Sequence, residues 1–273
     1  MSIRFLEMPN NLIKSLVCHR ELTWDLARRD FIGRYKGSML GVIWSLFNPL
    51  FMLVVYTIVF SGAFKARGGI GEESKITFAI ILFSGMIIHN LFAECLNRSP
   101  NLIISQPNYV KKVVFPLEIM PLVALLSALL HFLVSFCVLL IFCLLAGITI
   151  YPGVLLTPII ITPLVLMIMG LSWIFASLGV YLRDIAQVMG MLTTVALFLA
   201  PVFYPIESFP QAYRELLVWN PITLPIVQLR DQMFWNKPLL WGQWLFAFFI
   251  GVAVCWIGFW WFQKTRRGFA DVL

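Results

Sequence analysis

The segment RRDFIGRYKGSMLGVIWSLFNP, from Arg28 to Pro49, joins two stretches of different chemistry. The first part is basic and aromatic, which suits a membrane surface, and the second part is apolar, which suits the membrane interior. Between them, Lys36-Gly37-Ser38 forms a turn in which Ser38 is expected to be the N-cap of the next helix. We therefore predict a surface helix that leads directly into a membrane-spanning helix.

The composition places the chain in a membrane. Of its 273 residues, 60% are hydrophobic and 12% are charged, whereas soluble domains carry about 25% charged residues. We interpret the net charge of +7 as cytoplasmic anchoring charge, because the sequence has no nucleic-acid-binding motif. None of the five cysteines lies in a segment that we place outside the cytoplasmic membrane, so we expect neither a disulfide nor a CxxC metal site.

Six apolar segments are candidate spans, since a crossing needs about 20 residues. They comprise residues 39–64, 76–96, 117–147, 154–181, 185–203 and 239–262. We predict a single all-α integral membrane domain over residues 1–273 with six transmembrane helices. Its parts are a cytoplasmic interface segment (1–38), a six-span core (39–262) and a cytoplasmic tail (263–273).

The basic residues predict the orientation of these spans. With both termini in the cytoplasm, 14 of the 20 Lys and Arg residues fall inside and six fall outside. This distribution agrees with the positive-inside rule. Both termini are therefore predicted to be cytoplasmic.

The surface helix is expected over residues 21–36. Trp24, Ala27, Phe31 and Tyr35 recur at spacings of three and four and form one stripe of an amphipathic helix. One interpretation is an interface helix that receives force from a cytosolic partner, and the other is a passive membrane anchor. In the basic loop at 97–115, the apolar piece Leu102-Ile103-Ile104 is expected to form a small helix that lies against a partner, and the alternative is an ordinary topology-setting loop.

The segment at 204–238, between the fifth and sixth spans, is broken by Pro205, Pro210, Pro221 and Pro225. We expect two helical pieces in it, at 211–219 and 226–235. Its apolar content is too high for a solvated loop, so it is predicted to re-enter the membrane under cover of protein or water. It is either an external gate or a cap that seals the fold.

Aromatic residues are frequent on or beside the first and fifth spans. A pathway lined by aromatic rings would let a sugar chain slide without tight binding, whereas the alternative is an ordinary lipid-facing belt. The candidate pathway residues are Trp44, Phe47, Phe51, Tyr56, Phe198, Phe203 and Tyr204.

Motifs for chemistry are missing from the sequence. It contains no phosphate-binding loop, no zinc-protease motif and no nucleophile elbow, and we predict no catalytic residue, metal site or cofactor. His89 and His131 fall inside spans, where a lone histidine is more often packed than a proton relay. The chain is thus expected to be a transport protein driven by another subunit rather than an enzyme.

The sequence WDLARRDFIGRYKGSMLGVIW at 24–44 resembles the opening of polysaccharide-export ABC transporter permeases, whose pattern is R-D-x-x-x-R-Y-K-x-S-x-L-G-x-x-W. Pro49-Leu50 matches the pair that follows in that family. LGVYLRDI at 178–185, APVFYP at 200–205 and WNP at 219–221 resemble its later motifs. These motifs keep their order over nearly the whole chain.

The resemblance implies a type-2 ABC exporter of the bacterial inner membrane. Two copies of the chain would form the pathway, and two cytosolic ATPase subunits would bind ATP and Mg²⁺. The implied cargo is a lipid-linked glycan such as undecaprenyl-diphosphate-linked O-antigen, with capsular polysaccharide, teichoic acid, or a drug or lipid as alternatives. A lateral opening between the first and fifth spans would admit the lipid-linked end.

The resemblance also assigns candidate contacts. Segments 25–36 and 97–112 would contact the ATPase, through Asp25, Asp30, Arg98, Tyr109, Lys111 and Lys112. We further hypothesise that four basic residues attract the lipid diphosphate, namely Arg28, Arg29, Arg34 and Lys36. A membrane-embedded enzyme and a gradient-driven carrier are the competing classes, and the lack of a polar catalytic cluster and of mid-membrane carboxylates disfavours them.

Overall fold

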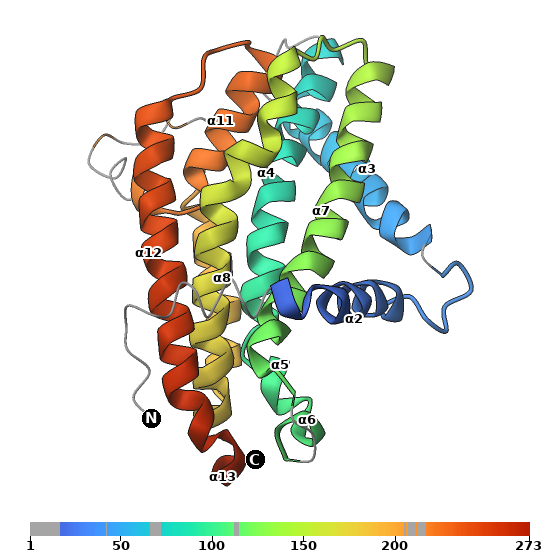
Figure 1. Cartoon of the computed structure of the whole chain (residues 1–273). Coiled ribbons are helices and arrows are strands. Elements are labelled where there is room, and N and C mark those ends of the chain that lie inside the picture. The colour runs from blue at the N-terminus through green and yellow to red at the C-terminus, as the bar shows by residue number, and fades with distance from the viewer. Residues whose placement is uncertain are drawn as a thin grey trace.

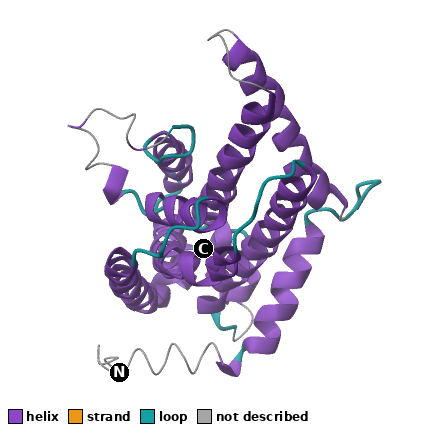
Figure 2. Ribbon diagram, turned by 90° about the horizontal axis from the view of Figure 1, so that it is seen from above, coloured by secondary structure: helices purple, strands orange, loops and turns teal. Residues whose placement is uncertain are grey.

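The computed structural model describes residues 17–41, 43–65, 72–111, 115–204, 206, 211 and 217–273. All regular structure in these ranges is helical (Figures 1 and 2). The principal helices are α2 (Arg20–Gly33), α3 (Ile43–Lys65), α4 (Glu72–Arg98), α7 (Met120–Leu145), α8 (Thr157–Tyr181), α9 (Ile185–Phe198), α11 (Thr223–Phe234) and α12 (Trp241–Thr265). The shorter ones are α5 (Asn101–Ile104), α6 (Pro107–Lys111), η2 (Leu117–Ile119), η3 (Pro152–Leu156), η5 (Arg266–Gly268) and α13 (Phe269–Val272).

Four stretches of the described helices are long and apolar enough to cross a membrane: Ile76–Arg98, Leu117–Leu145, Pro152–Tyr181 and Trp241–Val272. Two further apolar helices are shorter within the described residues, Ile43–Ile58 and Ile185–Phe198. The all-helical membrane class is therefore confirmed, and each of the six predicted segments contains a helix, although the fifth ends at Phe198 rather than at residue 203. The count of six complete crossings stays a prediction.

Helices α8 and α12 pack along most of their length (Figure 1). Their backbones approach closely at glycines, and a Cβ atom on Gly170 or Gly258 would collide with the backbone of the opposite helix. Small residues allow this close approach, which supplies the van der Waals contact that holds helices together in lipid. Trp173 and Phe259 pack edge to face beside the crossing, with ring centroids 5.1 Å apart.

The elbow between α2 and α3 is longer than the sequence predicted. Helix α2 ends at Gly33 and α3 begins at Ile43, whereas the first span was expected from residue 39. Gly37 and Gly41 adopt positive φ angles of 92° and 52°, which interrupt the helical path. The prediction that Ser38 caps the span is wrong, because its hydroxyl donates backward to the carbonyl of Tyr35, 3.0 Å away.

Helix α2 lies across the bundle, close to the end where α7 begins (Figure 1). The ends of α4, α8 and α12 and the short helices α5, α6 and α13 lie toward the same end. There, Arg266 pairs with Glu118 at 2.6 Å, and Pro100 packs so closely on Gly179 that a Cβ would not fit. The apolar piece predicted at 102–104 is confirmed as helical, since it forms α5.

Helix α11 packs against α4, α8 and η3. It corresponds to the second helical piece predicted between the last two spans, but it begins at Thr223 rather than at residue 226. Most of the first piece, predicted at 211–219, lies outside the described residues. The described part of this segment is largely buried, and Ile222, Ile226 and Leu229 are fully so.

Candidate functional site

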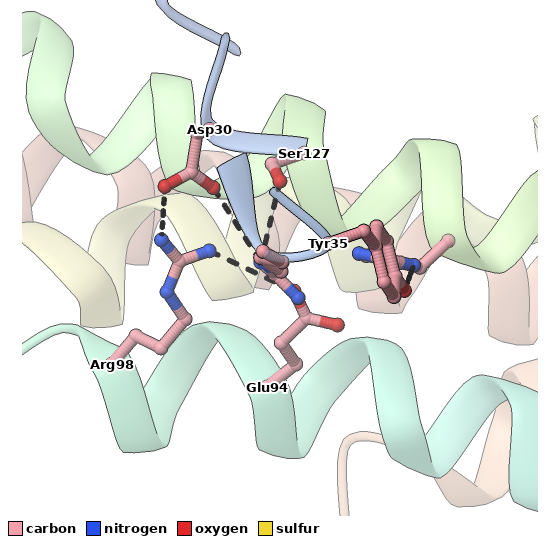
Figure 3. A network of polar contacts seen from close by, with 7 residues as sticks. Asp30, Tyr35, Glu94, Arg98 and Ser127 are labelled. Carbon is pink, nitrogen blue, oxygen red and sulfur yellow. Dashed lines mark hydrogen bonds and ion pairs between the residues drawn. The ribbon is translucent and has the colours of Figure 1, made fainter. Parts of the chain in front are cut away.

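Four charged residues join α2 to α4, and we call them the charge cluster: Asp30, Arg34, Glu94 and Arg98 (Figure 3). Arg98 donates to Asp30 across 2.7 Å. Arg34 pairs with Glu94 and lies 3.5 Å from Asp30. Arg98 and Glu94, one turn apart on α4, are separated by 3.7 Å. Charges therefore alternate around the cluster, and its formal sum is zero.

Helix α7 closes this arrangement from a third side. The Arg34 guanidinium donates to the hydroxyl of Ser127 over 3.3 Å. Tyr35 and His131 share a hydrogen bond of 3.3 Å, and the ring of Phe31 lies 4.6 Å from the His131 ring. The contact with α7 is thus held at two points, at Ser127 by the charged Arg34 side chain and at His131 by aromatic packing.

The electrostatics favour the ionised state of the cluster. Burial raises the pKa of the Asp30 carboxyl, but hydrogen bonds from Arg98 and Ser127 outweigh this effect and hold the pKa below its usual value. Burial lowers the pKa of the Arg34 guanidinium, and the neighbouring Glu94 carboxylate more than restores it, so the net pKa is raised. The side chains are 23–30% exposed, which makes each pair stronger than a fully solvated one.

The physical consequence is a firm attachment of α2 to the bundle. Thr23 and Ala27 of α2 are buried, and the charge cluster adds directional contacts to α4. A displacement of α2 relative to α4 and α7 would separate opposite charges that are only partly hydrated. Helix α2 is therefore held as part of the helical bundle and does not simply float on a membrane surface.

The sequence-predicted contact residues separate into three groups. Asp30, Arg34 and Arg98, which were assigned to different partners, lie together and bind one another. Asp25, Arg28, Arg29 and Lys36 are exposed on α2 and the turn after it. Tyr109 of α6 stacks on Phe115 with centroids 4.4 Å apart, Lys111 ends α6, and Lys112 lies outside the described residues.

The aromatic stripe of α2 faces two environments. Phe31 and Tyr35 contact His131 of α7 and so face the protein. Ala27 is buried, while Trp24 is 51% exposed. The stripe is therefore mainly a packing face against α7, and only its N-terminal end is open to a membrane or partner.

The candidate pathway residues lie on helices that both pack against α4. On α3, Trp44, Phe47 and Phe51 form a continuous exposed row, with successive centroids 5.2 and 6.3 Å apart. At the end of α9, Phe198 and Phe203 lie 6.0 Å apart, and the Tyr204 hydroxyl donates to the Phe198 carbonyl. Tyr56 is partly buried and packs against the core. Their role as a pathway stays a prediction.

Sequence reasoning missed three residues of the site, Glu94, Ser127 and His131. The spacing of Glu94 and Arg98 is a usable signal, because residues four apart share a helix face. Ser127 and His131 are also four apart, on α7, but no local pattern connects that helix with α2. Arg230 was missed as well: it was counted only among the six basic residues on the external side, and the structure buries it to 7% exposure.

Comparison with known proteins identifies the family. The model of the ABC-2 type transporter family matches residues 21–234, which includes α2, the charge cluster and α11. The chain belongs to the ABC-2 type transporter family. The family resemblance seen in the sequence motifs is thereby confirmed, and the apolar helices agree with a multi-pass membrane protein of this family.

Several curated relatives of this ABC-2 chain have transport names. An O-antigen export system permease protein RfbA of Klebsiella pneumoniae is 26% identical over 91% of this chain and 93% of its own. RfbA of Myxococcus xanthus is 24% identical over 95% of this chain and 98% of its own. The polysialic acid transport protein KpsM of Escherichia coli is 26% identical over 71% and 74%.

Proposed function

We propose that the chain is the membrane-spanning permease subunit of an ATP-driven exporter for lipid-linked polysaccharide, with undecaprenyl-diphosphate-linked O-antigen as the first candidate cargo. The observation that carries the proposal is the similarity, over more than 90% of both chains, to O-antigen export permeases. Two copies of the chain and two cytosolic ATPase subunits would form the complex in the bacterial inner membrane, with both termini of each copy in the cytoplasm.

The geometry supports a role for α2 in coupling. An ATPase that pushes on α2 would act on α4 through the charge cluster and on α7 through Ser127 and His131. If α2 were only loosely attached, it would move under such a force without displacing α4 and α7. This rigid attachment favours the force-receiving interpretation of α2 over the passive anchor.

The charges also refine the proposed contact with the lipid diphosphate. Arg34 is already engaged by two carboxylates, so its charge is largely compensated. Arg28, Arg29 and Lys36 are exposed and are better candidates for attracting an anionic headgroup. Neutralising Arg28 and Arg29 should then reduce export while the complex still assembles, whereas loss of assembly would indicate a docking role.

A second cargo class has a specific observation in its favour. KpsM is named for transport of polysialic acid, a polysaccharide, and aligns with 71% of this chain. Its shorter alignment leaves O-antigen as the first candidate. Capsular polysaccharide or teichoic acid would use the same architecture, as would a drug or lipid.

The decisive experiment deletes the gene in its host and follows the glycan. We expect surface polysaccharide to disappear and lipid-linked polysaccharide to accumulate inside. The wild-type chain should restore export only with an active ATPase partner, which should co-purify with it. Export that persists with a hydrolysis-deficient ATPase, under a proton gradient alone, would overturn the proposal.

The pathway assignment has its own test. Phe47 on α3 is 45% exposed, and Phe246 on α12 is 64% exposed, so neither supports the core. Phe47→Ala should lower the export rate several-fold if α3 lines the route, because a stacking surface worth about 1 kcal/mol is removed. Phe246→Ala is the matched control and should export normally. Equal rates in both variants would contradict the assignment.

A further inference from the structure

Arg230 of α11 is buried at a junction of three helices. Its Nε and Nη2 atoms donate to the Ile81 carbonyl of α4 at 3.1 and 2.8 Å, and Nε also lies 3.3 Å from the Ser84 hydroxyl. Its Nη1 and Nη2 atoms donate to the carbonyls of Pro201 and Val202, which follow α9. One side chain of α11 therefore holds α4 and the end of α9 together.

The acceptors around this guanidinium are all neutral. They are three backbone carbonyls and one hydroxyl, and the described residues contain no ion pair of Arg230. A buried charge without a counter-ion is costly unless hydrogen bonds compensate it. The planar fork of arginine matches several acceptors at once, which an ammonium group does not. The site consequently depends on geometry more than on charge.

The end of α9 explains why donors are needed here. With 14 residues, α9 is about 21 Å long, which is shorter than a hydrocarbon core of about 30 Å. The last carbonyls of a helix have no partner within it, and where a membrane excludes water they need donors from other parts of the protein. Asn220 donates to the carbonyls of Ala196 and Leu199 at 2.7 and 3.0 Å, and Arg230 donates to those of Pro201 and Val202 in the turn that follows.

Gly85 of α4 provides the space for the guanidinium. A Cβ atom at this position would lie 2.6 Å from Nη2 of Arg230, well inside van der Waals contact. An alanine here would displace the guanidinium without removing its charge. Gly190 on α9 has nothing within 4 Å of the corresponding position and offers a matched control.

We propose that Arg230 is a positioning residue for export, which locks the external end of α9 to α4 and makes α11 move with both helices. The inference rests on the proposed function, because it assigns α4 and α9 to the moving wall of the transport route. A motion of α4 that begins at the charge cluster would reach the external segment through the packing of α11 on α4 and through the hydrogen bonds of Arg230, which fix their relative positions. Without the lock, ATP hydrolysis would continue while the external segment no longer follows.

The test compares Gly85→Ala, Arg230→Gln and the control Gly190→Ala in the assembled complex with its ATPase. Polysaccharide exported per ATP hydrolysed should fall about fivefold or more in the first two variants, a ratio typical of lost coupling between sites. It should be unchanged in Gly190→Ala. The double variant Gly85→Ala/Arg230→Gln should match Arg230→Gln alone, because both changes remove the same interaction.

Three results would overturn the inference: normal coupling in Gly85→Ala, additive effects in the double variant, or full rescue by Arg230→Lys, which would mean that charge alone suffices. The unfolding temperatures of the purified single and double variants provide a second double-mutant cycle, which requires no cargo. Additive shifts there would also contradict a shared contact. Failure of the wild type to export polysaccharide would instead refute the proposed function, so the two failures are distinguishable.

Discussion

The charge cluster and the Arg230 site are two ways of burying arginine in one protein. In the cluster, Arg34 and Arg98 are 28% and 30% exposed and share two carboxylates. At the other site, Arg230 is 7% exposed and binds only carbonyl and hydroxyl oxygens. In the cluster, carboxylates neutralise the charge of the two arginines, whereas at the other site the positive charge of Arg230 is met only by neutral acceptors.

This difference indicates where each site tolerates change. Opposite charges attract at many angles, so the cluster should survive substitutions that keep the alternation of sign. Hydrogen bonds to carbonyls weaken steeply with angle, so the Arg230 site needs one side-chain shape. We expect the first contact to be robust to rearrangement and the second to be specific.

The largest effect is expected for Arg230→Met. The substitution removes every donor of Arg230 and leaves the carbonyls of Pro201 and Val202 without this partner, which should reduce the free energy of unfolding by about 3 kcal/mol. The measurement is denaturant or thermal unfolding of the purified chain in detergent. Lys237→Met is the control, because Lys237 is 61% exposed in its pair with Asp231 and should contribute less than about 1 kcal/mol. Similar losses of stability in both variants would contradict the conclusion that the Arg230 site contributes more than an exposed ion pair.

An intermediate effect is expected when the Asp30–Arg98 pair is reversed in sign. Asp30→Arg would gather three arginines around Glu94, and Arg98→Asp would place a second acid beside Asp30, so each should cost about 2 kcal/mol of stability. The double variant restores opposite charges at positions 30 and 98 but leaves like charges at 30 and 34 and at 94 and 98, so it should recover part of the loss. Unfolding measurements and protease cleavage within α2 follow both effects. A double variant that is worse than either single one would show that geometry, not charge, holds this site.

The smallest effect concerns acid. The folded-state pKa of Asp30 is lowered from an ordinary value of 3.8, so its contribution to stability is present above that value and is lost as the pH falls through the lower folded-state pKa. The stability difference between wild type and Asp30→Asn should therefore shrink below about pH 4. The difference between wild type and Arg230→Gln should not follow this titration, since the Arg230 site contains no carboxyl group. Parallel pH profiles for both variants would contradict the distinction.

Several elements of the fold were predictable because their signal is local. Runs of apolar residues located the helices α4, α7, α8 and α12, and the apolar piece after α4 located α5. The motifs around residues 24–44 and 178–185 identified the family, and the match over residues 21–234 confirms it. Helix ends were less accurate: α3 begins four residues later than expected, because Gly37 and Gly41 interrupt the chain.

The candidate site was predictable only in part. Asp30, Arg34 and Arg98 were recognised as important, but they were distributed among different external partners. The pairing of Asp30 with Arg98 joins residues 68 positions apart in sequence, and no periodicity reports such a contact. Arg230 was counted among the six basic residues on the external side, and neither its burial nor its hydrogen bonds were anticipated. Its bonds to Ile81 and Ser84 connect positions almost 150 residues apart.

The sequence by itself determined that this chain enters a membrane, that its elements are helical and that it belongs with ABC-2 transporters. Those properties depend on composition, on runs of apolar residues and on local motifs, all of which are present before the chain folds. Only the tertiary structure decided how each arginine is used. A charged group is stabilised by whichever oxygens surround it, and the packing of α2, α4, α7, α9 and α11 determines which oxygens those are.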